Sequence, residues 1–276
     1  MATASGCVFN GLMKGRTQAF TLVQIFMENT LNTPAYSPES TTVTVLNTFY
    51  YLAFFLFIIP VLTHFLAVAG ALIAGSLSDI ALNESWTESV SYFALTSGIA
   101  AVFLCATVKY SLNTRQLSLA GERLAFTSLR IKPLVSVLII TALFSSLERL
   151  SFEFWEMSAP VFITNVVEQL TSASNIVLLF LTVVIIAPVS EEVIFRGVAF
   201  YRLKETRLGV SGAIIIPSML FSLIHLQYEQ PIIFVMLFLS AVMFGVIRHI
   251  TGNLWYCVIS HMLMNLIVFV ECVVQG

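Results

Sequence analysis

Long apolar runs constrain the fold of this chain more than any other feature of its sequence. A membrane-spanning helix needs about 20 consecutive, mostly apolar residues. Seven runs approach or exceed that length, and an eighth helix would come from a break at Pro60 or from residues 155–172. We therefore expect an all-α fold, a polytopic transmembrane helical bundle of about seven to eight spans. The expected spans are residues 48–75, 90–109, 132–147, 174–195, 209–226, 231–248 and 253–273.

The composition agrees with a membrane protein. Charged residues make up 10% of the chain and hydrophobic residues 58%, whereas a soluble domain carries roughly 25% charged residues. The net charge of −2 provides no basic surface for nucleic acid. The four cysteines, Cys7, Cys105, Cys257 and Cys272, have no metal-ligand or C-x-x-C spacing, so neither a zinc site nor a disulfide framework is predicted.

The charges between the spans predict the orientation of the bundle. Basic residues dominate segments 109–132 and 202–208, whereas acidic residues dominate segments 76–89 and 148–173. Because positively charged connections stay in the cytoplasm, this alternation predicts a cytoplasmic N-terminus. The small chain and the lack of organelle signals favour a prokaryotic cell (inner) membrane. The expected regions are a polar, cytoplasmic N-terminal region at 1–47 and the transmembrane bundle at 48–276.

Ionisable residues inside the last four spans are the main functional signal. Such residues are costly in a membrane, usually face the bundle interior, and mark functional sites. The polar residues within or at the edges of these spans are Glu191, Glu192, Arg196, His225, Arg248, His249, His261 and Asn265.

Helix geometry separates the two adjacent glutamates. Glu192 and Arg196 are four residues apart, so they share a helix face and can form an ion pair. Glu191 is rotated by about 100° from Glu192 and points elsewhere. The Glu192–Arg196 pair is interpreted as mainly structural. Glu191 is interpreted as a general base, with a protonated, hydrogen-bonded core carboxyl as the alternative.

The depths of these side chains in the membrane favour a single pocket. At 1.5 Å per residue, Glu191 and His225 lie roughly 20 and 24 Å from the cytoplasmic ends of their helices, and His261 and Asn265 roughly 12 and 18 Å. A carboxylate, two imidazoles and an amide in overlapping layers can activate water and stabilise an oxyanion. The structural alternatives are a packing role for His225 and interhelical hydrogen bonds for His261 and Asn265.

Three ordered motifs carry a family resemblance. "EEVIFR" fits E-E-x-x-x-R, "FSLIH" fits F-x-x-x-H, and "HMLMN" fits H-x-x-x-N, with the turn "TGNLW" before the last motif. With these motifs in this order on successive apolar helices, the chain resembles the CAAX-protease and bacteriocin-processing (CPBP, or Abi) family of intramembrane glutamic endopeptidases. The resemblance covers about residues 174–270, which we expect to form the catalytic core.

The resemblance implies roles for the motif residues. Glu191 with His225 would activate the attacking water, His261 and Asn265 would form the oxyanion hole, and Glu192 and Arg196 would order the site. It also implies a metal-free site without a cofactor. The expected partner is a membrane-associated peptide or protein substrate in the lipid bilayer, cleaved near its C-terminus.

Two alternatives remain at this point. Glu191, His225 and His261 could supply three ligands of a catalytic zinc ion, although no H-E-x-x-H sequence is present. The chain could instead be a non-enzymatic membrane protein, a transporter or an immunity protein, with a buried ion or proton site. Against a transporter, no paired interrupted helices occur in two halves of the sequence.

Overall fold

The described part of the chain is helical throughout. The computed structural model describes residues 38–78, 89–113, 124–225 and 227–275, and these ranges contain no strand. The expected all-α transmembrane bundle is therefore confirmed. The helical segments are α2 (Pro38–Ala53), η1 (Phe54–Ile58), α3 (Ile59–Ser78), α4 (Val90–Asn113), α6 (Ile131–Phe154), α7 (Val161–Glu168), α8 (Ala173–Leu179), η4 (Phe180–Ile186), α9 (Ala187–Glu192), η5 (Val193–Ala199), α10 (Phe200–Lys204), α11 (Gly209–Leu223), α12 (Pro231–Thr251) and α13 (Leu254–Gln275).

Within the described ranges, six helices are long and apolar enough to cross a membrane. Six of the seven expected spans correspond to them. The seventh, expected at 209–226, is the shorter apolar helix α11 of 15 residues. The stretch 155–172 contains only the eight-residue helix α7. Of the expected N-terminal region at 1–47, residues 1–37 lie outside the described ranges, and the candidate span begins at Thr42.

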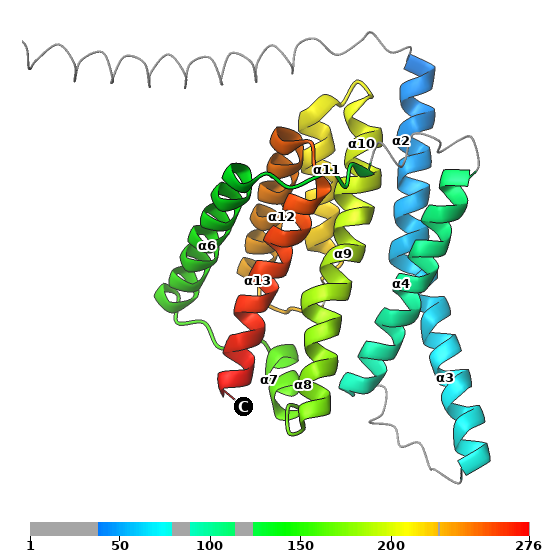
Figure 1. Cartoon of the computed structure of the whole chain (residues 1–276), viewed down its shortest axis with the longest axis vertical. Coiled ribbons are helices and arrows are strands. Elements are labelled where there is room, and N and C mark those ends of the chain that lie inside the picture. Colours follow the sequence, from blue (N-terminus) through cyan, green and yellow to red (C-terminus); the bar gives the residue numbers. More distant parts are fainter. Residues whose placement is uncertain (1–37, 79–88, 114–123, 226, 276) are drawn as a thin grey trace, which may run out of the picture.

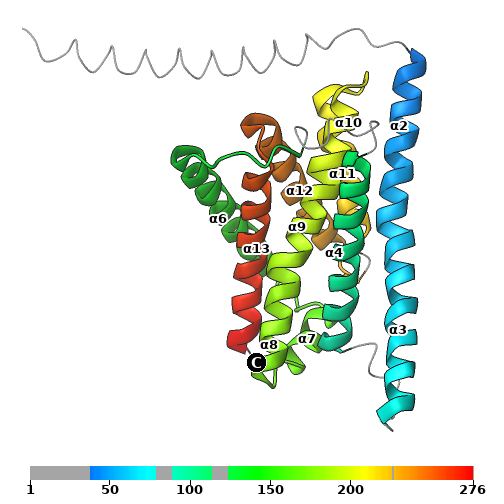
Figure 2. The same ribbon diagram turned by 45° about the vertical axis from the view of Figure 1, so that its right-hand side comes forward.

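Two of these crossings are continuous helices that contain π-helical turns. The first runs from α2 through η1 to α3 without a break at Pro60. Proline removes a backbone donor from a helix, and the π-turn η1 directly precedes it. Figure 2 shows α2 and α3 as one rod along an edge of the molecule. The second runs from Ala173 to Lys204, with η4 and η5 on either side of α9.

The α8–α10 helix forms the centre of the bundle. α11, α12 and α13 pack around it, and α6 covers the far side of α13 (Figures 1 and 2). α2 packs against η5 and α10 of the central helix, and α4 packs against α3, α8 and η4. Phe195, Phe221 and Phe244 are 2% exposed or less and come from η5, α11 and α12. The core therefore joins α12 to the two parts of the chain that carry the first and second motifs.

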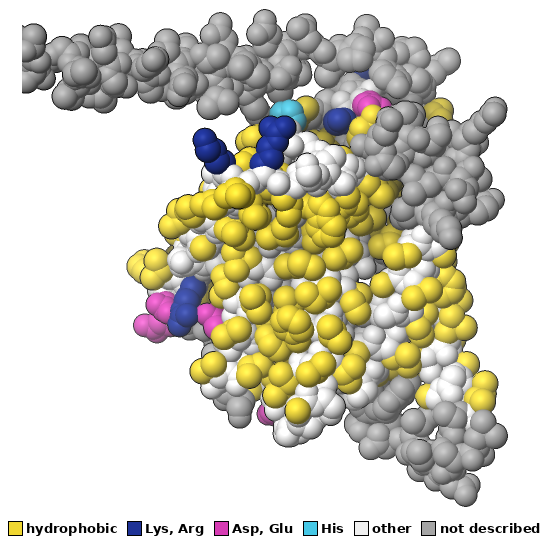
Figure 3. Space-filling view, in the orientation of Figure 1, with side chains coloured by type: hydrophobic (Ala, Val, Ile, Leu, Met, Phe, Trp, Pro, Cys, Tyr) yellow, Lys and Arg dark blue, Asp and Glu magenta, His cyan; other side chains and the backbone are white. Residues whose placement is uncertain are grey.

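The outer surface matches a membrane environment. Figure 3 shows a broad apolar face with Lys, Arg and His side chains at one end and acidic side chains near the other. Lys132, in the first turn of α6, is exposed, as are Glu153 and Glu156 at its other end. The chain is an integral membrane protein by these features, and which end faces the cytoplasm stays a prediction.

An irregular segment before α6 is bonded to the turn before α13. The Leu254 amide donates to the Ala125 carbonyl at 3.1 Å, and the Asn253 side chain donates to Thr127 O at 3.0 Å. The Tyr256 hydroxyl accepts from the Arg130 amide at 2.7 Å. These bonds fix the start of α13, and with it the height of His261.

The close packing of α11 on α12 gives a prediction. A Cβ added at Gly245 would lie 3.0 Å from Cγ2 and 3.3 Å from Cγ1 of Ile214, whose β-branched side chain has little rotamer freedom. Gly245→Ala should therefore destabilise the protein by about 1–3 kcal/mol in a thermal or denaturant unfolding measurement.

Gly98→Ala is the matched control, because its added Cβ would meet no atom within 4 Å. It should be neutral or slightly stabilising, since alanine favours helix by about 1 kcal/mol over glycine. Equal stability of the two variants would contradict the close packing at Gly245.

Candidate active site

A fully buried ion pair stands at the centre of the site. The Arg196 Nη1 donates to Glu192 Oε1 at 2.8 Å, and both side chains are 2% exposed or less. This is the i,i+4 pair expected from the sequence. At the end of α9 and within η5, the chain thus places opposite charges on one face of the central helix.

Further contacts offset the cost of burying the Arg196 charge. Its Nη2 donates to the Ala241 carbonyl of α12 at 2.7 Å. Its guanidinium carbon lies 5.1 Å from the ring centroid of Phe221, 5.2 Å from that of Phe244 and 5.9 Å from that of Phe195. An aromatic face attracts a cation within about 6 Å, and more strongly when water is excluded. The guanidinium therefore has a carboxylate, a carbonyl and three rings as its surroundings.

His261 connects the two glutamates. Its Nδ1 lies 3.0 Å from Glu192 Oε1, and its Nε2 lies 3.8 Å from Glu191 Oε2. The ring stacks on Phe244 with centroids 5.0 Å apart and meets the Phe221 ring edge-on at 5.7 Å. A Glu192 carboxylate at Nδ1 favours a proton on that nitrogen, and Nε2 faces Glu191.

The two glutamates occupy different environments. Glu192 is fully buried, whereas the Glu191 side chain is 26% exposed and has His261 as its one ionic contact in the described part of the chain. This difference agrees with the expected 100° rotation between them. Glu192 Oε2 is buried and accepts no hydrogen bond from the described residues. It keeps acceptor capacity for a further donor.

Within the described ranges, His225 and Asn265 form hydrogen bonds with backbone carbonyls and none with the two glutamates. His225 Nδ1 lies 2.6 Å from the Phe221 carbonyl, and its ring packs against the Phe221 ring with centroids 4.7 Å apart. Asn265 Nδ2 donates to the Val183 carbonyl of η4 at 2.9 Å. Among the described residues, no hydrogen bond or ion pair joins His225 or Asn265 to either glutamate. Their predicted roles in chemistry stay predictions.

Several residues of the site carried no assigned role in the sequence analysis. Phe244 and Ala241 have no distinguishing signal, because apolar residues fill every span. Tyr228 stacks on His225 at 6.3 Å with the ring planes 13° apart. Burial and the nearby Glu191 carboxylate raise the pKa of Tyr228 to about 12, so its hydroxyl keeps its proton at neutral pH. It lies in the short connection after α11, which hydropathy alone marks only as a loop.

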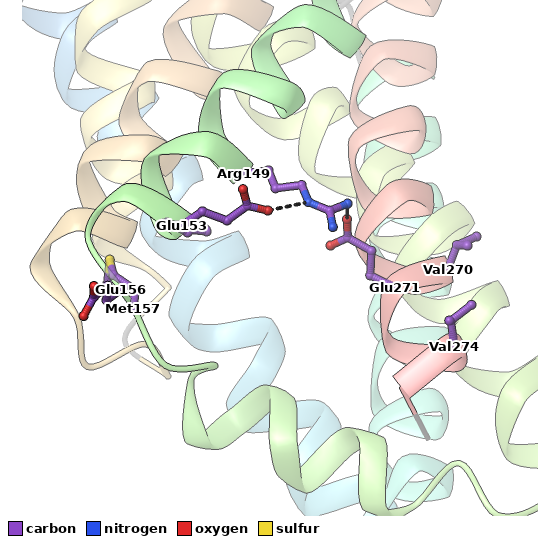
Figure 4. Close-up of a pocket in the computed structure, with 8 residues that line it drawn as sticks. Arg149, Glu153, Glu156, Met157, Val270, Glu271 and Val274 are labelled. Atoms are coloured by element: carbon purple, nitrogen blue, oxygen red, sulfur yellow. Dashed lines mark hydrogen bonds and ion pairs between the residues drawn. The ribbon is translucent and has the colours of Figure 1, made fainter.

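Two hollows are not lined by any of the predicted site residues. One, of about 490 Å³, is at the ends of α6 and α13, where Arg149 pairs with Glu153 at 3.2 Å and Glu271 at 2.8 Å (Figure 4). None of the motif residues lines it. The other, of about 480 Å³, is almost wholly apolar and lies between α4 and the central helix. Val189, Ser190 and Val193 line it, so it borders the glutamate-bearing turn.

The geometry bears on the zinc alternative. In the described ranges, no group of three or more His, Cys, Asp or Glu side chains is arranged to hold a metal ion. His261 approaches Glu191, but His225 does not complete a set with them. Metal independence of the chemistry itself stays a prediction.

Comparison with known families gives an independent result. Residues 173–267 match the family model described as type II CAAX prenyl endopeptidase Rce1-like. This segment is similar to that family. The matched stretch runs from α8 into α13 and contains all three motifs, which confirms the resemblance to the CPBP family. No curated protein and no solved structure matches the chain.

The buried ion pair between Glu192 and Arg196 leads to a prediction. Arg196→Met leaves the Glu192 carboxylate buried without its partner, and breaking a buried pair in this way costs about 3–5 kcal/mol. The unfolding midpoint should fall accordingly. The double variant Glu192→Gln with Arg196→Met should recover part of the loss, because it removes both charges.

Arg149→Met is the control for this experiment. Arg149 also contacts two carboxylates, but its side chain is 65% exposed. Exposed pairs contribute about 0–1 kcal/mol, so its midpoint should stay near wild type. An Arg196→Met variant as stable as Arg149→Met would show that the buried pair does not hold the site together.

Proposed function

We propose that this protein is an intramembrane endopeptidase that hydrolyses a peptide bond near the C-terminus of a membrane-associated protein or peptide, with water activated by a glutamate. The observation that carries the proposal is the contact of one histidine with two glutamates in unlike environments. Glu192 is buried and charge-paired, whereas Glu191 is partly exposed and faces His261 Nε2. The match to a CAAX endopeptidase family over this segment supports the same reaction class.

In the proposed reaction Glu191 is the general base. Its Oε2 and His261 Nε2 are 3.8 Å apart, so one water molecule fits within hydrogen-bond reach of both. Glu191 takes a proton as the water oxygen attacks the peptide carbonyl carbon. The tetrahedral intermediate then collapses, the C–N bond breaks, and Glu191 returns the proton to the leaving amine. The products are a carboxylic acid and an amine.

The remaining motif residues have supporting roles in this proposal. Glu192 holds His261 through Nδ1, and Arg196 holds Glu192. Asn265 uses one of its two amide hydrogens on the Val183 carbonyl, so the second is free to donate to an oxyanion together with His261. The family resemblance gives His225 a share in activating the water. The Phe221 carbonyl at His225 Nδ1 supports that role, because it leaves Nε2 as an acceptor.

The site also limits the class of substrate. The glutamates lie well inside a long apolar helix, so the scissile bond must reach them from a segment already associated with the membrane. We propose a peptide or small membrane protein as substrate. We further propose a prokaryotic inner-membrane location with the basic end of the bundle in the cytoplasm.

The decisive experiment is the intact mass of a candidate peptide expressed with the protein. Membrane-anchored peptides ending in a CAAX sequence, with and without a prenyl group, should lose their C-terminal residues with wild-type protein. The mass should stay unchanged with Glu191→Gln, because the amide cannot accept the proton of the water.

Glu153→Gln serves as the control, because Glu153 is exposed and pairs only with Arg149 among the described residues. It should cleave like wild type. Cleavage by Glu191→Gln at a wild-type rate would remove Glu191 as the base, and cleavage of neither peptide by any form would count against this substrate class.

A second prediction concerns Asn265. Loss of one oxyanion donor lowers turnover by roughly 10²–10³-fold in other hydrolases, so Asn265→Ala should lower kcat by that order with little change in KM. A purely structural hydrogen bond between helices contributes only about 0.6 kcal/mol. In that case kcat per folded molecule would stay within a few-fold of wild type, and the oxyanion role would be excluded.

A third prediction is metal independence. Activity of the purified protein should survive prolonged chelation, and elemental analysis should find less than one equivalent of zinc. Loss of activity on chelation, with recovery when zinc is returned, would replace the glutamate mechanism by a metal-dependent one.

A further inference from the structure

A second buried arginine contacts the backbone of the helix that carries Glu192 and Arg196. Arg248, near the end of α12, is 5% exposed, and its Nε donates to the Arg196 carbonyl at 3.1 Å. An arginine near the end of a membrane helix usually extends its side chain to the membrane interface, whereas Arg248 is buried. Its burial against the backbone of the motif helix therefore needs an explanation that the three motifs do not supply.

The contact is half of a reciprocal arrangement. Arg196, on η5, donates through Nη2 to the Ala241 carbonyl of α12 at 2.7 Å, while Arg248, on α12, donates to the Arg196 carbonyl of η5. Ala241 and Arg248 are seven residues apart, which is about two turns along one face of α12. Each helix thus holds the backbone of the other through one guanidinium, and we call this pair of contacts the arginine clasp.

We infer that Arg248 is a positioning residue of the active site and sets the place of Glu192 and His261 through the arginine clasp. The contacts run in sequence from Arg248 to the Arg196 backbone, from the Arg196 side chain to Glu192 Oε1, and from that oxygen to His261 Nδ1. Each contact is a direct hydrogen bond, the first to a backbone carbonyl and the other two between side chains. The four residues are 6% exposed or less.

The π-helical turn explains why such a restraint is useful. Arg196 lies within η5, where hydrogen bonds run from residue i to residue i+5. π-turns are rare and occur often at functional sites, because they change the direction of the side chains that follow a regular turn. A donor from α12 to a carbonyl inside this turn fixes how far η5 rotates relative to α12. That rotation decides where the Arg196 side chain meets Glu192.

The inference rests on the proposed function for its kinetic consequence. A displacement of about 1 Å can lower turnover by about 10²-fold when it comes from a residue remote from the chemistry. Arg248→Met should therefore lower kcat per folded molecule by about 10- to 100-fold and leave KM nearly unchanged. Arg248→Lys keeps the charge and one donor, and should recover part of the loss. Lys132→Met removes an exposed charge from the first turn of α6 and should have no effect.

A readout that needs no activity separates the two proposals. The chain has four histidines, so ¹⁵N-histidine labelling gives few imidazole signals, and His261→Gln assigns one of them. In wild type, His261 should show a protonated Nδ1, the nitrogen that contacts Glu192 Oε1. Arg248→Met should change the His261 signals more than those of His64, and Lys132→Met should change neither.

Unchanged His261 signals in Arg248→Met would overturn the positioning role, whether or not the protein proves to be a protease. If Arg248→Met does not fold, Arg248→Lys takes its place. Wild-type kcat together with wild-type His261 signals in Arg248→Lys would then overturn it. Changed His261 signals in a protein without peptidase activity would support the clasp while counting against the proposed function.

Discussion

The buried charge of Arg196 is the constraint on which the rest of the structure depends. A guanidinium that is 1% exposed in an apolar bundle must find its compensation within the protein. Glu192, the Ala241 carbonyl and three aromatic rings provide it, and they come from the central helix, α11 and α12. The central helix, α11 and α12 are thereby held at one point, and His261 of α13 joins them through Glu192.

The different roles that we propose for the two glutamates agree with this arrangement. Charge compensation uses the carboxylate that shares a face with Arg196, so Glu192 is committed to structure. Glu191, the preceding residue of the helix, is turned away by about 100° and keeps its carboxylate partly exposed beside His261. The same helix can therefore carry one carboxylate that is fixed and one that is available to react. The arginine clasp would keep Glu192 and His261 at fixed positions relative to Glu191.

Much of this arrangement follows from local rules in the sequence. Hydropathy locates six spans and the shorter α11, and the four-residue spacing predicts the Glu192–Arg196 pair. The contact of His261 with Glu192 depends on the rotation of α13 about its axis, which the pattern within α13 does not determine. For the same reason Asn265, one turn after His261, turns out to meet Val183. Arg248 and Arg196 are 52 residues apart in the sequence, so no local sequence pattern predicts the contact between them.

The measurement that tests this account most directly is a comparison of two isosteric variants, Glu191→Gln and Glu192→Gln, in one unfolding experiment. Each removes a single negative charge from adjacent positions of one helix. The account predicts that Glu192→Gln lowers the unfolding free energy by several kcal/mol, about 3–5, because Arg196 loses its counter-ion in a buried site. Glu191→Gln should unfold within about 1 kcal/mol of wild type. Equal losses in both variants, or a larger loss in Glu191→Gln, would contradict the separation of structure and chemistry between these two residues.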